Sequence, residues 1–198
     1  MERVRNVEKF RLASQRSSTL RAAQTPTLFA SIVECKNTYV AIPKVSSENR
    51  RYIPMDFLSG EIIPGDKLFT MSDANLYHFG VLTSNVHMAW MRAVCGRLKS
   101  DYSYSNTIVY NNFPWCNPTS EQKEKIKQTA QAILDARNLF PDCSLADLYD
   151  SVAMPPQLRK AHQLNDKAVM EAYGFPIKNF TESDCVAELM KMYQELTK

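Results

Sequence analysis

Apolar and polar residues follow two different periodicities between residues 1 and 110. A three-to-four-residue apolar spacing or a helix-capping sequence predicts helices over residues 4–10, 17–23, 25–29, 73–79 and 84–95. Short runs rich in β-branched and aromatic residues predict strands over residues 38–45, 51–54, 67–71 and 106–110. This irregular mixture of short elements is typical of an α+β fold with small sheets.

A purely helical pattern replaces this mixture after Pro114. Thr119 and Gln122 form a capping-box sequence, and an apolar stripe at helical spacing follows at Ile126, Ala130, Ile133 and Leu134. Further helix starts and stops are indicated by Ser144, Pro156, Gly174 and the pair Thr181 and Asp184. We therefore predict a mixed sheet-and-helix domain over residues 1–117 and a helical C-terminal domain over residues 118–198. An exposed junction would let a protease cut near residues 117–120.

Charge is distributed unevenly along the chain. Residues 1–110 carry 14 Lys and Arg against 9 Asp and Glu, a net charge of +5, whereas residues 111–198 carry 10 against 12, a net charge of −2. A basic half suits a polyanionic partner, although an ordinary solvated surface explains the same asymmetry. No apolar run approaches the ~20 residues of a membrane helix, and MERVRNVEKF lacks the apolar stretch of a signal peptide. We expect a cytoplasmic protein with no membrane partner.

Residue types that catalyse reactions or bind metals do not cluster in the sequence. The five cysteines include no C-x-x-C pair, and the three histidines lie far apart, at positions 78, 87 and 162. Walker, G-x-S-x-G and H-E-x-x-H motifs are missing. The stretch YNNFPW lacks the consecutive prolines of the adenine-methyltransferase loop that it superficially resembles. We expect reduced cysteines, no metal, no catalytic residues and no cofactor in this chain.

The stretch GRLKSDYSYSN, from Gly96 to Asn106, places opposite charges two residues apart. In an extended strand, alternate residues share a face, so Lys99, Asp101, Ser103 and Ser105 would point the same way. A lysine donates to guanine O6 and N7, and a carboxylate accepts from the amino group of cytosine. The pair is therefore complementary to one G·C pair in the major groove. A surface ion pair, worth ~0.5 kcal/mol, is the plainer explanation.

Basic and hydroxyl side chains nearby are candidates for phosphate contacts. They are Ser46, Ser47, Arg50, Arg51, Arg97 and Ser105. Adjacent arginines on a turn suit phosphate binding, with hydroxyls as additional donors. Two alternatives stay open: one of the paired arginines neutralises Glu48, and Arg97 pairs with Asp101.

The run from His78 to Trp115, HFGVLTSNVHMAWMRAVCGRLKSDYSYSNTIVYNNFPW, resembles the target-recognition domain of Mme-type single-chain restriction–modification enzymes. The stretches from Phe10 to Phe29 and from Ile42 to Pro54 support this resemblance. It extends from about Arg3 to Trp115, and the helical tail agrees in order and length only.

This resemblance implies that the chain is the C-terminal part of a longer polypeptide that carries an adenine-N6 DNA methyltransferase. The base-discriminating pair of the family falls at Lys99 and Asp101, and Ser103 stands where the family often has an arginine. Implied partners are duplex DNA and the methyltransferase domain of the same polypeptide. The complete protein would use S-adenosylmethionine, and Mg²⁺ where it also carries an endonuclease.

Taken together, these features predict sequence-specific recognition of duplex DNA. One alternative is a helical protein-interaction module without DNA binding, which requires an exposed apolar groove within residues 119–198. A second alternative is a free-standing enzyme, which requires a cleft where titratable groups converge.

Overall fold

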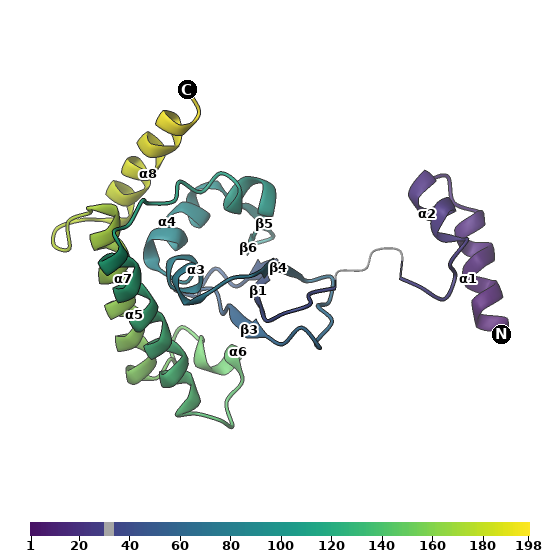
Figure 1. The fold of residues 1–198 in the computed structure, drawn as a ribbon, viewed down its shortest axis with the longest axis horizontal. Helices are drawn as coiled ribbons and strands as arrows, with labels where there is room; N and C mark the ends of the chain where they lie inside the picture. Colours follow the sequence, from purple (N-terminus) through teal and green to yellow (C-terminus); the bar gives the residue numbers. More distant parts are fainter. Residues whose placement is uncertain (30–33) are drawn as a thin grey trace. The chain divides into compact units, whose positions relative to one another are not determined.

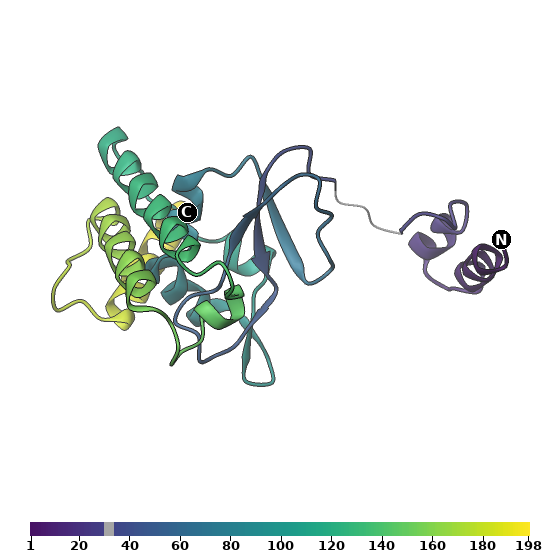
Figure 2. The same ribbon diagram turned by 90° about the horizontal axis from the view of Figure 1, so that it is seen from below.

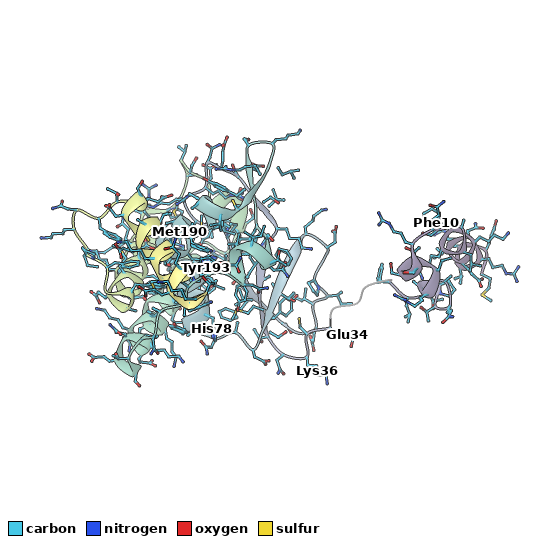
Figure 3. All side chains as sticks on the ribbon, turned by 90° about the horizontal axis from the view of Figure 1, so that it is seen from above. Phe10, Glu34, Lys36, His78, Met190 and Tyr193 are labelled. Atoms are coloured by element: carbon cyan, nitrogen blue, oxygen red, sulfur yellow. The ribbon has the colours of Figure 1, made fainter. Side chains whose placement is uncertain are left out.

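The computed structural model describes residues 1–29 and 34–198, which form two compact units, Met1–Glu34 and Cys35–Lys198. The N-terminal unit contains α1 (Glu2–Leu12) and α2 (Ser17–Ala22). The Arg11 guanidinium joins them, because it donates to the carbonyl oxygens of Ala22, Thr25 and Leu28 at 2.7, 2.9 and 2.7 Å. No residue of α1 is buried, and the side chain of Phe10 is exposed (Figure 3).

One helix predicted in this unit is wrong. Residues 25–29 form a turn that is closed by a bond of 3.0 Å from the Leu28 N–H to the Thr25 carbonyl. The Arg11 side chain occupies carbonyls in the same segment, and this long-range contact was not visible in a local capping pattern.

Two three-stranded antiparallel sheets lie in the larger unit. In the first, β1 (Tyr39–Pro43) lies between β3 (Asp56–Leu58) and β4 (Leu68–Ser72). In the second, β6 (Asp101–Ser103) lies between β2 (Val45–Ser46) and β5 (Gly96–Leu98). The predicted strand 38–45 is thus divided at Lys44, whose backbone N–H donates to Lys67 and whose carbonyl accepts from Tyr104. Lys44 carries the chain from one sheet to the other.

The helices of this unit are α3 (Leu76–Leu82), α4 (Asn85–Val94), α5 (Ser120–Asn138), α6 (Leu145–Leu148), α7 (Pro156–Tyr173) and α8 (Glu182–Leu196). Their ends follow the predicted caps: capping boxes open α5 and α8, Pro156 opens α7, and Gly174 ends it with a φ of 71°. Figures 1 and 2 show α5 and α7 side by side. The α+β fold class is therefore confirmed.

Two of the predicted strands are wrong. Residues 51–54 belong to no strand, with a bend at Arg51 and Tyr52. Both Tyr52 and Ile53 are 1% exposed, so neighbouring side chains are buried together instead of alternating. Residues 106–110 form the single π-helical turn η1 (Asn106–Tyr110), which the Ser105 hydroxyl caps by accepting from the Ile108 N–H. The indole of Trp90 donates to the Val109 carbonyl at 2.9 Å, so tertiary contact overrides the strand propensity of this β-branched run.

One hydrophobic core joins both sides of the predicted boundary. Its buried residues come from β1, α3 and α4 on one side and from α5, α7 and α8 on the other. At the contact between α3 and α5, a Cβ atom on Gly80 would come within 2.7 Å of the Ile126 side chain, so only glycine permits this approach. On α8, Tyr193 lies 5.9 Å from the Trp90 ring, and Met190 packs against the same core (Figure 3). The boundary at residue 117 stays a prediction.

Because of this shared core, we expect the unit Cys35–Lys198 to unfold in urea as one cooperative transition. Far-UV circular dichroism reports mainly on α5, α7 and α8, whereas the fluorescence of the two tryptophans, at positions 90 and 115, reports on the residues before position 117. The two signals should give the same midpoint, and a cut near residues 117–120 should leave the two pieces associated. Two separate midpoints would show that residues 118–198 fold on their own.

Candidate nucleic-acid interface

The proposed base-reading pair lies on a tight hairpin. Strands β5 and β6 are joined by the two residues Lys99 and Ser100, with Leu98 paired to Asp101. Lys99 has a φ of 57°, which is uncommon for a residue with a Cβ atom. The expectation that Lys99 and Asp101 share one face of a single strand is therefore wrong. Lys99 is exposed at the turn, and Asp101 begins the returning strand.

The alternation expected along residues 101–104 is confirmed. Tyr102 and Tyr104 are buried, and the Tyr104 hydroxyl lies 3.0 Å from Nε2 of His87 in the core. Asp101 and Ser103 are partly exposed on the other face. Packing of the two tyrosines thus fixes the hairpin on the body of the protein and leaves the polar face accessible.

Arg97 binds within the hairpin. Its guanidinium lies 4.2 Å from the centre of the Tyr102 ring and donates to the Ser100 carbonyl at 2.9 Å. Among the residues that the structure describes, it forms no ion pair, so the alternative pairing with Asp101 is not observed. Arg97 remains exposed, with its charge not neutralised by a carboxylate.

The turn after β2 lies against this hairpin. Ser46 pairs with Tyr102, and the backbone N–H of Glu48 donates to Oδ1 of Asp101 at 3.3 Å. The Ser47 hydroxyl accepts from the Asn49 N–H at 3.3 Å. Residues 47–51, which we call the arginine loop, are therefore adjacent to the charged hairpin turn.

Ser46 does not fit its predicted role at a phosphate. Ser46 is 3% exposed, and its hydroxyl has no hydrogen-bond partner in the described part of the chain. The strand pairing of Ser46 with Tyr102 turns the residue inward. Ser46 is therefore not accessible to a DNA phosphate.

The two arginines of the loop differ in their surroundings. Arg50 is partly buried, and its backbone N–H donates to the Ser47 carbonyl at 3.1 Å. Arg51 is exposed, and its carbonyl accepts from Nη2 of Arg92 at 2.7 Å. Neither loop arginine forms an ion pair within residues 1–29 and 34–198, so the alternative in which one neutralises Glu48 is not observed.

A cavity of about 510 Å³ opens beside the arginine loop. The loop lines one side, α4 contributes Asn85 and Arg92, and the start of α8 contributes Thr181 and Glu182. Arg92 and Glu182 form an ion pair of 2.9 Å across it. The cavity therefore adjoins residues on both sides of position 117.

Three buried polar residues on α7 were not predicted from the sequence. They are His162, Asn165 and Asp166, all on the helix face that also buries Leu158 and Val169. The available signal was three polar residues at the spacing of an apolar stripe. Each contacts the half before residue 117: His162 stacks on Tyr52 at 4.1 Å, Asn165 donates to the Gly80 carbonyl at 2.7 Å, and Asp166 accepts from the Tyr52 hydroxyl at 2.7 Å.

Two further properties concern the described residues as a whole. Nowhere in them do three or more His, Cys, Asp or Glu side chains gather as metal ligands do. None of their helices has the length and apolar character needed to cross a bilayer.

Comparisons with known proteins place the chain in a family. Residues 1–117 match the family model "MmeI, target recognition domain", and residues 118–198 match "MmeI, C-terminal domain". DNA methyltransferase A of Bacillus subtilis (strain 168) is 37% identical over 197 residues, which is 99% of this chain and 22% of that protein. The type IIL restriction-modification enzyme MmeI, solved in complex with DNA, is 43% identical with a TM-score of 0.94. That match covers 99% of this chain and 26% of the solved chain.

The chain thus spans about a quarter of the length of these relatives. The resemblance inferred from the run between His78 and Trp115 is confirmed. The chain belongs to the MmeI family, with its target recognition domain matched by residues 1–117 and its C-terminal domain by residues 118–198.

Proposed function

We propose that this chain recognises a specific sequence in duplex DNA and directs an adenine-N6 methyltransferase domain of the same polypeptide to it. The observation that carries the proposal is the β5–β6 hairpin, with Lys99 exposed at its turn and Asp101 beside it, next to a loop whose two arginines form no ion pair with the described residues. A two-stranded β-ribbon fits into the major groove, where each base pair presents a distinct pattern of donors and acceptors. The solved MmeI complex contains DNA, and it is 43% identical to this chain.

Base reading is assigned to the hairpin turn, which carries Lys99, and to the polar face of β6, which carries Asp101 and Ser103. Lys99 donates to guanine O6 and N7, Asp101 accepts from the amino group of cytosine, and Ser103 follows on the same face of β6. Asp101 already accepts one backbone N–H, at 3.3 Å from Glu48, through Oδ1. Its other oxygen is available for a base.

Phosphate contacts are assigned to side chains around the hairpin. They are Ser47, Arg50, Arg51, Arg97 and Ser105. The guanidinium groups carry this role, because charge-assisted bonds to phosphate dominate the affinity of DNA-binding proteins. Ser105 contributes least, since its hydroxyl already accepts from the Ile108 N–H and lies 2.9 Å from the Thr107 hydroxyl.

The complete polypeptide would act in the cytoplasm and use S-adenosylmethionine as methyl donor. Where it also carries an endonuclease, that domain would use Mg²⁺. Both cofactors would bind outside the residues described above, whose contribution is to select the DNA site.

Replacing both Arg50 and Arg51 with alanine should weaken binding to all duplex sequences to a similar extent. The plot of log Kd against log salt concentration should lose about 2 units of slope, because about 0.9 counterions are released for each phosphate contact. Fluorescence anisotropy with mixed-sequence duplexes at several salt concentrations measures both effects. Selection from a random duplex library should return the unchanged preferred sequence.

The matched control replaces Lys167 and Lys178 with alanine. Both are exposed and form no ion pair within the described residues, so the control removes the same net charge elsewhere. It should alter the slope much less. A changed preferred sequence with an unchanged slope in the Arg50 and Arg51 variant would contradict phosphate binding by the arginine loop.

A further inference from the structure

A buried carboxylate on α7 binds the segment that directly follows the arginine loop. Asp166 is 5% exposed, and its Oδ2 accepts from the Tyr52 hydroxyl at 2.7 Å. Its Oδ1 accepts from the backbone N–H of Asn85 at 2.7 Å, at the start of α4. One side chain from the C-terminal part therefore holds two elements of the target recognition part.

The backbone around Tyr52 has few hydrogen bonds of its own. Residues 50–54 belong to neither sheet, and the chain bends at Arg51 and Tyr52. Their position is set by side chains: Tyr52 is stacked on His162 with ring centres 4.1 Å apart, and the Arg51 carbonyl is bound by Arg92. Arg92 is itself paired with Glu182 of α8 at 2.9 Å. Both supports of the loop thus lead to the C-terminal helices.

Stability alone does not account for a carboxylate at this position. Removing a charge from water costs free energy that hydrogen bonds only partly offset, and apolar replacements of buried charges are often neutral or stabilising. Burial raises the pKa of Asp166 to about 6. The two hydrogen bonds and the positive charges of Arg51 and Arg92 act in the opposite direction and lower this pKa. Two hydrogen bonds of defined direction do, however, fix the geometry of their partners.

We propose that Asp166 is a positioning residue for DNA binding, which acts through Tyr52 and the Asn85 backbone to hold Arg50 and Arg51 where they meet the phosphates. This inference rests on the proposed function, and it assigns to the C-terminal part a role at the DNA interface. Asp166 lies inside the protein, so it makes no contact with DNA itself.

Three substitutions separate positioning from simple stability. Asp166→Ala removes both hydrogen bonds. Asp166→Asn preserves both, because its carbonyl oxygen accepts from the Asn85 N–H while its amide donates to the Tyr52 hydroxyl, which accepts as readily as it donates. Tyr52→Phe removes one bond from the loop side and keeps the ring that stacks on His162.

The readout is the salt dependence of duplex binding by the 198-residue chain, measured on protein shown to be folded by its urea transition. Asp166→Ala should weaken binding about tenfold and lose about 1 to 2 units of salt slope, similar to the loss of the two arginines. Asp166→Asn should restore the affinity and slope of the unchanged chain. The affinity and salt slope of Tyr52→Phe should lie between those of Asp166→Ala and Asp166→Asn. If Asp166→Ala does not fold, Tyr52→Phe provides the test of the positioning role.

Failure of this inference is distinguishable from failure of the proposed function. If alanine at residues 50 and 51 lowers the slope while folded Asp166→Ala and Tyr52→Phe bind as the unchanged chain does, the positioning role is overturned and the arginine contacts stand. If Asp166→Asn binds as weakly as Asp166→Ala, the charge is what matters and the positioning role is again overturned. If the unchanged chain shows no salt-dependent binding, the proposed function and this inference both fall.

Discussion

Exchanging the charges of the hairpin, by Lys99→Glu together with Asp101→Arg, is expected to invert the orientation of one G·C pair in the recognised site. Glutamate at residue 99 would accept from cytosine, and arginine at residue 101 would donate to guanine, so donor and acceptor trade places against the same pair. Each contact that is lost should cost ~1–3 kcal/mol of discrimination at that base pair. Methylation-site mapping in cells that express the full-length polypeptide reads the outcome directly.

The single substitutions are the controls for this exchange. Each places two like charges near one another and should reduce activity more than the double exchange does. Alanine at residue 99 or 101 should relax one position of the site and leave the others unchanged. An active double variant with an unchanged recognition sequence would remove the base-reading role and leave the hairpin charges as ordinary surface groups.

Acidification is expected to destabilise the unit Cys35–Lys198 through two buried histidines. Burial lowers the pKa of His87 to about 3 and that of His162 to about 3, and the nearby Arg137 and Arg51 charges add to the effect at His162. Both therefore stay neutral in the folded protein while they become charged in the unfolded chain below about pH 6.5. Each should remove about 3 kcal/mol of stability between pH 7 and pH 4.

Asp166 changes stability in the opposite direction over the same range. Because its pKa is raised to about 6, Asp166 binds a proton at a higher pH in the folded protein than in the unfolded chain. The contribution of Asp166 to the free energy of unfolding therefore increases as the pH falls from about 6 to 4. This offsets about 2 kcal/mol of the histidine effect. The carboxylates of Asp147, Asp150 and Asp184 have lowered pKa values and act below about pH 4.

Urea unfolding at pH values from 4.5 to 7.5 tests this balance. Between pH 4.5 and 5.5 the free energy of unfolding should fall by about 1.5 kcal/mol per pH unit. His87→Gln retains a polar group for the Tyr104 hydroxyl but cannot titrate, so its curve should be nearly flat there. Burial and the Lys123 charge lower the pKa of the partly exposed His78 less than burial lowers that of His87, so His78→Gln should reduce the slope less than His87→Gln does. A His87→Gln curve as steep as that of the unchanged protein would contradict the assignment.

The helices of residues 118–198 were predictable because their signals are local. Thr119 with Gln122, and Thr181 with Asp184, satisfy backbone groups within a few residues, so the sequence alone locates those ends. The errors at residues 51–54 and 106–110 have the opposite origin. There the backbone follows contacts with distant residues, such as the bond from Trp90 to Val109, which no local pattern contains.

The site residues named from the sequence stay predictions, and the geometry of the site was predicted only in part. Strand alternation correctly placed Asp101 and Ser103 opposite the two buried tyrosines. The turn at Lys99 was missed because the sequence there, Leu98-Lys99-Ser100-Asp101, lacks the glycine or asparagine that usually occupies positive φ. Asp166 was missed because its partners are remote in sequence, as the bonds to Tyr52 and Asn85 show.

The positive φ of Lys99 also constrains how recognition would drift during evolution, given the proposed base-reading role. Residue 99 is exposed and outside the core, so exchanges there leave packing untouched. Lysine or arginine at residue 99 would select guanine, glutamate or aspartate would select cytosine, and asparagine would select adenine. The left-handed backbone admits all five residue types, and asparagine and aspartate most readily. Threonine, which would contact the thymine methyl group, is β-branched and strained in that conformation. Proteins that evolve from this one should therefore change the base read by residue 99 readily among guanine, cytosine and adenine. They should acquire a preference for thymine through this position least often.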